Sequence, residues 1–180
     1  MEGKNRDDLV FNLYYSYNIE NLNYHFNARL NNLLTLIQLL LSSAIIGDLS
    51  RYTSNLNIDI ILGLILTVIS SLVIVYRFGE KLVSSRIAAD RYSALIHRHS
   101  NMSDNELANA LLETNSINNQ ITGAFADIAY KRSSIQLNRE DRTELTPYQS
   151  IIAKFCGENF NERTNPISRE LPPKETNPTT

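Results

Sequence analysis

Two long runs of apolar residues without a single charge dominate the pattern of the sequence. They cover residues 30–47 and 60–76. A helix of about 20 apolar residues crosses the ~30 Å hydrocarbon layer of a bilayer, and about 17 can suffice. The second run contains only mildly polar interruptions, whereas asparagines and Gln38 interrupt the first. The pattern predicts two membrane spans, over about 30–49 and 58–76.

About a dozen residues separate the two runs, so the spans are predicted to form a hairpin. The alternative is a pair of buried helices in a soluble bundle. A chain of 180 residues rarely provides a core wide enough to surround helices that are apolar around their whole circumference. The membrane hairpin is therefore the favoured interpretation.

Basic residues are distributed unevenly around this hairpin. The connection between the runs holds one, Arg51. The two flanks hold the others that lie near the spans: Lys4, Arg6, Arg29, Arg77, Lys81, Arg86, Arg91 and Arg98. Since basic residues are enriched on the cytoplasmic side of membrane proteins, both termini are predicted to be cytoplasmic.

Helical periodicity continues on both sides of the hairpin. Apolar and aromatic residues in 8–29 recur on one helical face, and no proline or glycine separates them from the first span. A second cytoplasmic helix is predicted over 77–100, with Tyr92 and Leu95 in its buried stripe. Gly79 lowers helix stability by about 1 kcal/mol relative to alanine, which makes it a candidate hinge.

Two further helices are predicted from their capping signals. Ser103 and Glu106 have the spacing of a capping box, which starts a helix over 103–137. Its apolar positions follow a seven-residue repeat: Leu107, Thr114, Ile121, Ile128 and Ile135, with Ala110, Ile117 and Ala124 in the second register. This repeat is typical of a coiled coil between copies or of an intramolecular hairpin with the preceding helix.

The end of the chain changes composition. Thr146 followed by Pro147 starts a last helix, over 147–160. Residues 163–180 hold four of the five prolines and few apolar residues, which predicts a disordered tail. The overall expectation is an all-α protein: a transmembrane hairpin that continues into a cytoplasmic helical bundle or coiled coil, one domain over 1–162.

Composition argues against several classes of function. The net charge is −2, so no basic field indicates direct binding of nucleic acid. The single cysteine, Cys156, excludes a disulfide within the chain and multi-cysteine metal sites. His97 and His99 are two residues apart and point to different faces of a helix. No phosphate-binding loop or nucleophile motif is present. We expect no enzyme activity, no cofactor, no metal site and no catalytic residue.

Polar residues inside the two runs form the candidate site. They lie on one helical stripe in each span: Thr35, Gln38 and Ser42 in the first, and Gly63, Thr67 and Ser70 in the second. Such stripes allow helices to approach closely and to hydrogen-bond, and they can also line a water-filled path in an oligomer. Gln38 is the strongest candidate for a pore-facing residue, because an amide in hydrocarbon requires a partner or water.

The order of these segments resembles a known family. The strings that carry the resemblance are "YYSYN" and "YHFNARL" before the first span, "YRFGEKL" and "RIAADRYSALIHR" after the second, and "CGENFNE" near the end. Over about residues 10–162 the chain is similar to the SLATT family, two-transmembrane effector domains of bacterial conflict systems.

The resemblance implies a location and a function. It implies a bacterial inner-membrane effector that forms a homo-oligomer and makes the membrane leaky when a sensor or nucleotide-signalling partner detects phage infection. The residues after the second span, Arg77, Gly79, Glu80 and Lys81, would then form the joint between sensor helices and span. The cytoplasmic contacts would involve Tyr92, Leu95, Leu107, Ile117, Ile121 and Ile128. The alternative is a membrane anchor or scaffold that recruits a partner through its cytoplasmic helices.

Overall fold

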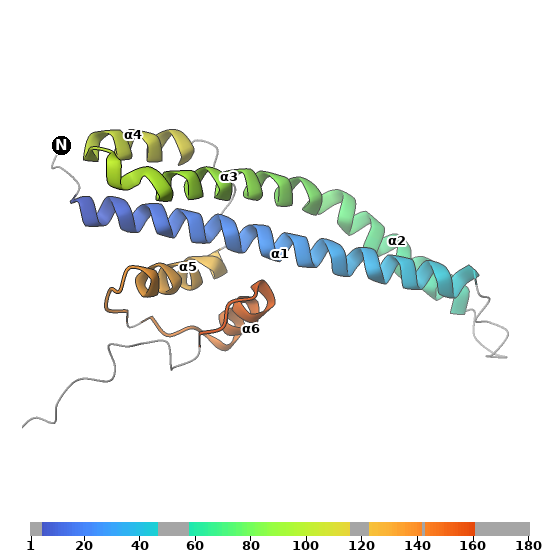
Figure 1. Cartoon of the computed structure of the whole chain (residues 1–180). Coiled ribbons are helices and arrows are strands. Elements are labelled where there is room, and N and C mark those ends of the chain that lie inside the picture. Colours follow the sequence, from blue (N-terminus) through green and yellow to red (C-terminus); the bar gives the residue numbers. More distant parts are fainter. Residues whose placement is uncertain (1–4, 47–57, 116–122, 142, 161–180) are drawn as a thin grey trace, which may run out of the picture.

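A single helix, α1 (Arg6–Ile46), extends through the whole protein and contacts nearly every other element (Figure 1). The computed structural model describes residues 5–46, 58–115, 123–141 and 143–160, apart from the side chains of residues 46, 58 and 59. Neither proline nor glycine occurs in the 41 residues of α1, so no residue breaks its hydrogen-bond ladder. The segment that precedes the first apolar run and the run itself are thus one continuous helix.

The other elements are helical as well. They are α2 (Ile58–Tyr76), α3 (Phe78–Arg98), a short 3₁₀ turn η2 (His99–Asn101), α4 (Asp104–Asn115), α5 (Gly123–Gln136) and α6 (Pro147–Cys156). In the described ranges no strand occurs. The all-α prediction with two long apolar helices is confirmed. The predicted tail over 163–180 lies outside the described residues.

The other helices pack against two opposite sides of α1. α2 and α3 follow α1 on one side along most of its length, and α4 packs beside α3 (Figure 1). α5 and α6 lie on the other side of α1. Each side has its own core: Leu9, Leu13, Tyr92, Leu95, Leu107 and Leu111 join α1, α3 and α4, whereas Ile19, Leu22, Phe125, Ile128, Ala129, Ile152, Ala153 and Cys156 join α1, α5 and α6.

The predicted helix over 103–137 is replaced by two helices, α4 and α5, on opposite sides of α1 (Figure 1). Leu107 and Ile128 are both completely buried, as their shared repeat suggests, but they lie in different cores. The seven-residue repeat therefore does not form one seam. Ile117 and Ile121 lie outside the described residues.

Local capping defines the ends of the shorter helices. Ser103 and Glu106 form the predicted capping box, with Ser103 N donating to Glu106 Oε2 at 2.7 Å. Thr146 and Gln149 form a second one at the start of α6, with Pro147 in the first turn. α6 ends at Gly157, whose φ of 93° belongs to the left-handed region that favours glycine.

Candidate functional site

The outer surface of the helical hairpin is apolar. Both helices are long and apolar enough to cross a membrane, and no residue of their most apolar stretches is buried within the chain. Large side chains are openly exposed on both, for example Leu39 at 62%, Leu64 at 65% and Ile74 at 75%. A core helix of a soluble protein passes the same test of length and composition, but its apolar side chains are mostly buried. The exposure here fits an apolar solvent.

A hydrogen bond joins the polar stripes of the two helices. Gln38 Nε2 donates to Ser70 Oγ at 3.1 Å, and both side chains are partly buried. Thr35 and Thr67 instead donate to the backbone oxygens of the preceding turn, at Asn31 and Gly63. Ser42 and Gly63 are half-buried. In this single copy, the polar stripe contributes to packing between the two helices.

The joint between α2 and α3 lies at Arg77, where the backbone adopts φ 50° and ψ 45°. This left-handed conformation is unfavourable for residues other than glycine and separates α2 from α3. Gly79, the predicted hinge, is an ordinary residue of α3, and open space surrounds the position where a Cβ would lie. Of the residues predicted for the joint, Arg77 therefore has the left-handed backbone, and a hinge at either Arg77 or Gly79 stays a prediction.

Side chains around the joint hold it together. Arg77 pairs with Glu80 at 2.8 Å on an exposed surface, where an ion pair contributes at most about 1 kcal/mol. The Tyr76 ring stacks on Phe78 with centroids 5.6 Å apart, and the Lys81 ammonium lies 5.9 Å from the centroid of Tyr76. Aromatic and basic side chains thus lie together where the second apolar run ends.

At the start of the first apolar run, Arg29 connects α1 to α6. Its guanidinium donates to the carbonyl oxygen of Phe155 at 2.6 Å and so caps the last turn of α6. The Phe155 ring also packs edge-on against Phe26 of α1. The contact fixes α6 beside the residue where the charge-free run begins. The sequence reveals Arg29 as a flanking charge, but its partner is a backbone oxygen 126 positions away.

The bundle formed by α1, α3, α4, α5 and α6 buries several polar side chains. Asn18 Nδ2 donates to Ser133 Oγ at 2.9 Å and to Gln136 Oε1 at 2.7 Å, which links α1 to α5. Tyr92 is 1% exposed and its hydroxyl donates to Asn115 Oδ1 at 2.6 Å. Burial raises the pKa of Tyr92, and the charge of Glu20 acts in the same direction. These contacts were not predicted from the sequence, because asparagine and serine within a helix are normally exposed.

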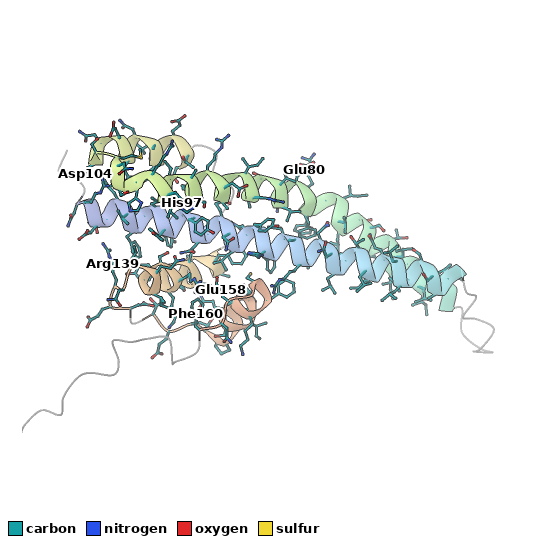
Figure 2. The ribbon with its side chains drawn as sticks, viewed as in Figure 1. Glu80, His97, Asp104, Arg139, Glu158 and Phe160 are labelled. Carbon is teal, nitrogen blue, oxygen red and sulfur yellow. The ribbon has the colours of Figure 1, made fainter. Side chains whose placement is uncertain are left out.

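Arg6 forms hydrogen bonds at the end of the bundle that lies farthest from the hairpin. Its guanidinium donates to the Met102 oxygen and to Asp104 Oδ1, both at 2.8 Å, and also to the His99 oxygen. The beginning of α1 is thereby tied to the turn between α3 and α4. Figure 2 shows Asp104 and His97 at this end, far from Glu80 at the joint.

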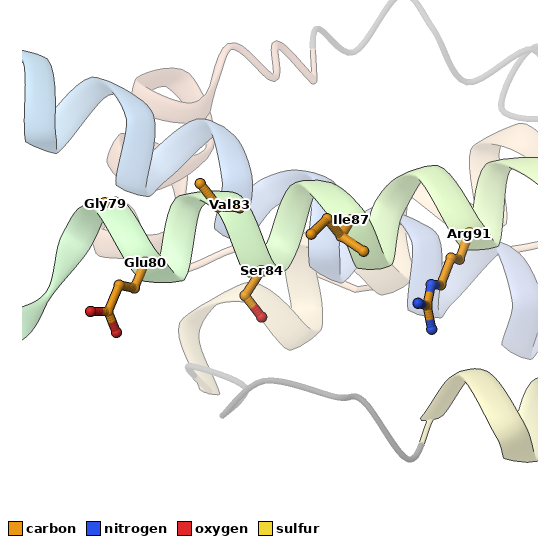
Figure 3. A pocket seen from close by; sticks show the side chains of 6 residues that line it. All are labelled: Gly79, Glu80, Val83, Ser84, Ile87 and Arg91. Atoms are coloured by element: carbon orange, nitrogen blue, oxygen red, sulfur yellow. The ribbon is translucent and has the colours of Figure 1, made fainter.

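Open hollows lie on the surface of the described part of the chain, and two of them are defined by their lining residues. One, of about 570 Å³, follows the outer side of α3 and is lined by Gly79, Glu80, Val83, Ser84, Ile87 and Arg91 (Figure 3). The other, of about 530 Å³, lies between α5, α6 and the segment that connects them, and its lining includes Lys131 and Lys154. Among the described residues, no group of three or more His, Cys, Asp or Glu side chains could hold a metal ion. Cys156 is 4% exposed, and burial raises the pKa of its thiol to about 11.

Comparisons with models of protein families, with curated proteins and with solved structures find no match to this chain. Its function is inferred below from the sequence and from the geometry.

Proposed function

We propose that the chain is a bacterial inner-membrane effector. It assembles into a homo-oligomer and permeabilises or depolarises the membrane when a sensor partner is triggered by phage infection, which causes abortive infection. The observation that carries the proposal is the exposed apolar surface of the hairpin, which is continuous with a well-packed polar-faced bundle. The resemblance to the SLATT family supplies the biological setting.

The charge distribution supports an orientation with both termini in the cytoplasm. Arg29 and Arg77 mark the bundle side of the two apolar runs, and Lys81 and Arg86 follow within three turns. Basic residues near span ends are retained on the cytoplasmic side. Tyr76 and Phe78, stacked at the same level, suit the interface between headgroups and hydrocarbon.

The two spans are connected to the bundle in different ways, which suits signal transmission. α1 passes from bundle to span without a break, so the first span moves with the bundle. α2 is separated from α3 by the left-handed residue Arg77, so the second span can change its tilt. A partner that shifts α3 relative to α1 would change the angle between the spans.

Two helices cannot enclose a pore, so permeabilisation requires several copies. Gln38 is the residue that we expect to face the water-filled path, after exchanging its bond to Ser70 for water or for a neighbouring copy. The second candidate function is a membrane anchor or scaffold without a pore. The hydrogen bond between Gln38 and Ser70 within one copy favours it, because it satisfies the amide without any oligomer.

Membrane potential, measured with a voltage-sensitive dye in bacteria that express the chain, distinguishes these functions. We expect the parent to depolarise the cells and Gln38→Leu to abolish the effect. Ser70→Ala removes the same hydrogen bond but leaves the Gln38 amide in place, so we expect it to remain active. Membrane levels of the three proteins are matched by fractionation.

The outcomes separate a pore-facing residue from a packing residue. Equal loss of activity in Gln38→Leu and Ser70→Ala would assign the bond to packing and contradict the pore-facing role. A parent that reaches the membrane and leaves the potential unchanged, also with its native partner and phage present, would favour the anchor.

A further inference from the structure

Outside the hairpin, α3 and α6 each carry a pair of exposed large apolar side chains. Val83 and Ile87 on α3 are 56% and 46% exposed. Tyr148 and Ile151 on α6 are 66% and 68% exposed. These pairs lie on opposite sides of α1, because α3 and α6 cover opposite sides of that helix (Figure 1). A pair of exposed apolar side chains is not in itself an interaction site, so the charges and rings that surround each pair also matter.

The α3 patch consists of the six residues that line the hollow in Figure 3. Val83 and Ile87 are one turn apart, and the face of α3 opposite them holds the buried residues Ser85, Ala88, Ala89 and Tyr92. Glu80 lies at the membrane end of the patch and Arg91 at the other end. The patch is therefore an apolar centre with an acidic end and a basic end.

The α6 patch consists of Tyr148, Ile151 and Lys154, all of which are exposed. The opposite face of α6 is buried through Ile152, Ala153 and Cys156. Lys154 belongs to the last turn, which Arg29 caps beside the start of the first span. This patch has a basic end near the membrane, an apolar centre and an aromatic end.

Both patches lie at the same level along α1. On the α3 side, the Arg86 guanidinium lies 5.9 Å from the centroid of the Tyr24 ring. On the α6 side, Cys156 Sγ contacts the Leu22 oxygen at 3.8 Å, and Arg29 binds the Phe155 oxygen. Each patch thus flanks the segment 22–29, immediately before the first apolar run. Figure 2 shows the labelled Glu80 on the α3 side and Glu158 on the α6 side.

We propose that the α3 patch of one copy binds the α6 patch of the next copy. The inference rests on the proposed membrane insertion and names the contact through which the homo-oligomer forms. Copies that share one bilayer lie at one depth, so only patches at equal depth can meet. The two patches differ from each other, so the contact is head-to-tail. Contacts of this kind generate a closed ring when the rotations between successive copies add up to a full turn.

The chemistry of the two patches is complementary. Ile151 inserts between Val83 and Ile87 of the neighbouring copy. At the membrane end, the Lys154 ammonium meets the Glu80 carboxylate, which otherwise pairs with Arg77 on an exposed surface. At the other end, the Arg91 guanidinium lies against the ring of Tyr148, a favourable cation–π pair. Two copies related by a two-fold axis along the membrane normal would instead bring Glu80 against Glu80.

Cysteine crosslinking in native membranes tests this contact. The full-length chain carries Cys156→Ala, which removes the native thiol, together with Val83→Cys and Ile151→Cys. After mild oxidation, we expect a ladder of dimers, trimers and larger species on a non-reducing gel. Each single-cysteine chain alone should remain monomeric, and coexpression of the two should produce a dimer and nothing larger.

Leu112→Cys is the matched control, because Leu112 is also 68% exposed but lies on α4, next to the core around Leu9 and Leu13. Combined with Val83→Cys it should give no ladder. A monomer in the Val83→Cys and Ile151→Cys chain overturns the contact. Dimers of Val83→Cys alone also overturn it, because they indicate a two-fold contact.

The same cells report separately on the proposed function. Depolarisation by the parent without a crosslinked ladder in the double-cysteine chain overturns the head-to-tail contact and leaves the effector function intact. A ladder without depolarisation confirms the contact and counts against permeabilisation.

Discussion

Arg29 and Gly157 depend on each other at the point where the bundle meets the first apolar run. The guanidinium of Arg29 binds the Phe155 oxygen and lies directly over Gly157, where an added Cβ would be 2.9 Å from Nη2. Gly157 also has a φ of 93°, which side-chain-bearing residues rarely adopt. The backbone conformation thus favours a glycine, and an added Cβ would also displace the flexible end of the Arg29 side chain.

Gly157→Ala is expected to destabilise the bundle. The left-handed conformation alone costs about 1–2 kcal/mol for a residue with a Cβ, and the displaced guanidinium adds to this loss. Thermal unfolding in detergent should show a lower midpoint. Gly79→Ala is the matched control, since nothing lies within 4 Å of its Cβ, and its midpoint should stay equal or rise. An unchanged midpoint in Gly157→Ala would contradict the requirement for a glycine at this left-handed position.

Cys156 should be an unreactive thiol in the folded protein. Burial raises its pKa from 9.0 to about 11, so at pH 8 the reactive thiolate is about 100-fold less abundant than in an unfolded chain. A time course with a maleimide should show slow labelling that becomes fast in denaturant. Equal rates in both conditions would place the thiol at an accessible surface.

The same pKa shift has a defined effect on stability. Below pH 9 the thiol is protonated in both the folded and the unfolded chain. As the pH rises from 9 towards 11, the unfolded chain loses this proton first, so the free energy of unfolding falls. The contribution of Cys156 to stability is therefore present at neutral pH and is lost in alkaline solution.

Among the elements, the joint between α2 and α3 determines how the second span can move. The prediction is that Arg77→Val lowers depolarisation, because a β-branched residue is strongly disfavoured at φ 50°, whereas Arg77→Gly retains it. Gly79→Ala should retain full activity, because Gly79 has an ordinary helical backbone. The voltage-sensitive dye measures all three variants at matched membrane levels. Loss of depolarisation in Gly79→Ala, together with normal depolarisation by Arg77→Val, would indicate that the hinge lies at Gly79.

The elements also show which kinds of structure the sequence predicts. Charge-free runs of sufficient length identify both apolar helices. The capping box of Ser103 and Glu106 identifies the start of α4, and Thr146 followed by Pro147 identifies the start of α6. The left-handed residue Arg77 has no local signal, because arginine is a good helix former, and Gly79 nearby attracted the hinge prediction. The repeat that contains Leu107 and Ile128 predicts that both residues are buried, but it does not predict that they lie in different cores, because apolar periodicity indicates a buried face without identifying its partner.

The candidate site was predictable only in part. Gln38 and Ser70 could be placed on facing stripes from their spacing, and a hydrogen bond does connect them. The contacts of Arg29 and Asn18 were not predictable, because their partners lie more than a hundred positions away. Long-range pairing of this kind depends on tertiary packing, and a single sequence contains no direct signal for it.

On the scale of the whole molecule, α1 links two environments. Its first half is surrounded by α3, α4, α5 and α6 and buries polar side chains such as Asn18 and Glu20. Its second half packs against α2 and exposes large apolar side chains, namely Leu33, Leu36, Leu39 and Leu40. The transition occurs around Arg29 and, on the other helix, Arg77. A molecule with this division fits a bundle in water and a hairpin in a bilayer.

The central claim is that the hairpin crosses a membrane with both termini on the cytoplasmic side. Labelling of intact bacteria with a membrane-impermeant maleimide tests it most directly. Two single-cysteine chains, both with Cys156→Ala, carry either Asn55→Cys between the apolar runs or Ser103→Cys at the exposed start of α4. We predict that position 55 is labelled in intact cells and position 103 only after lysis. Protection of both positions in intact cells, with the protein recovered in the soluble fraction, would contradict the account.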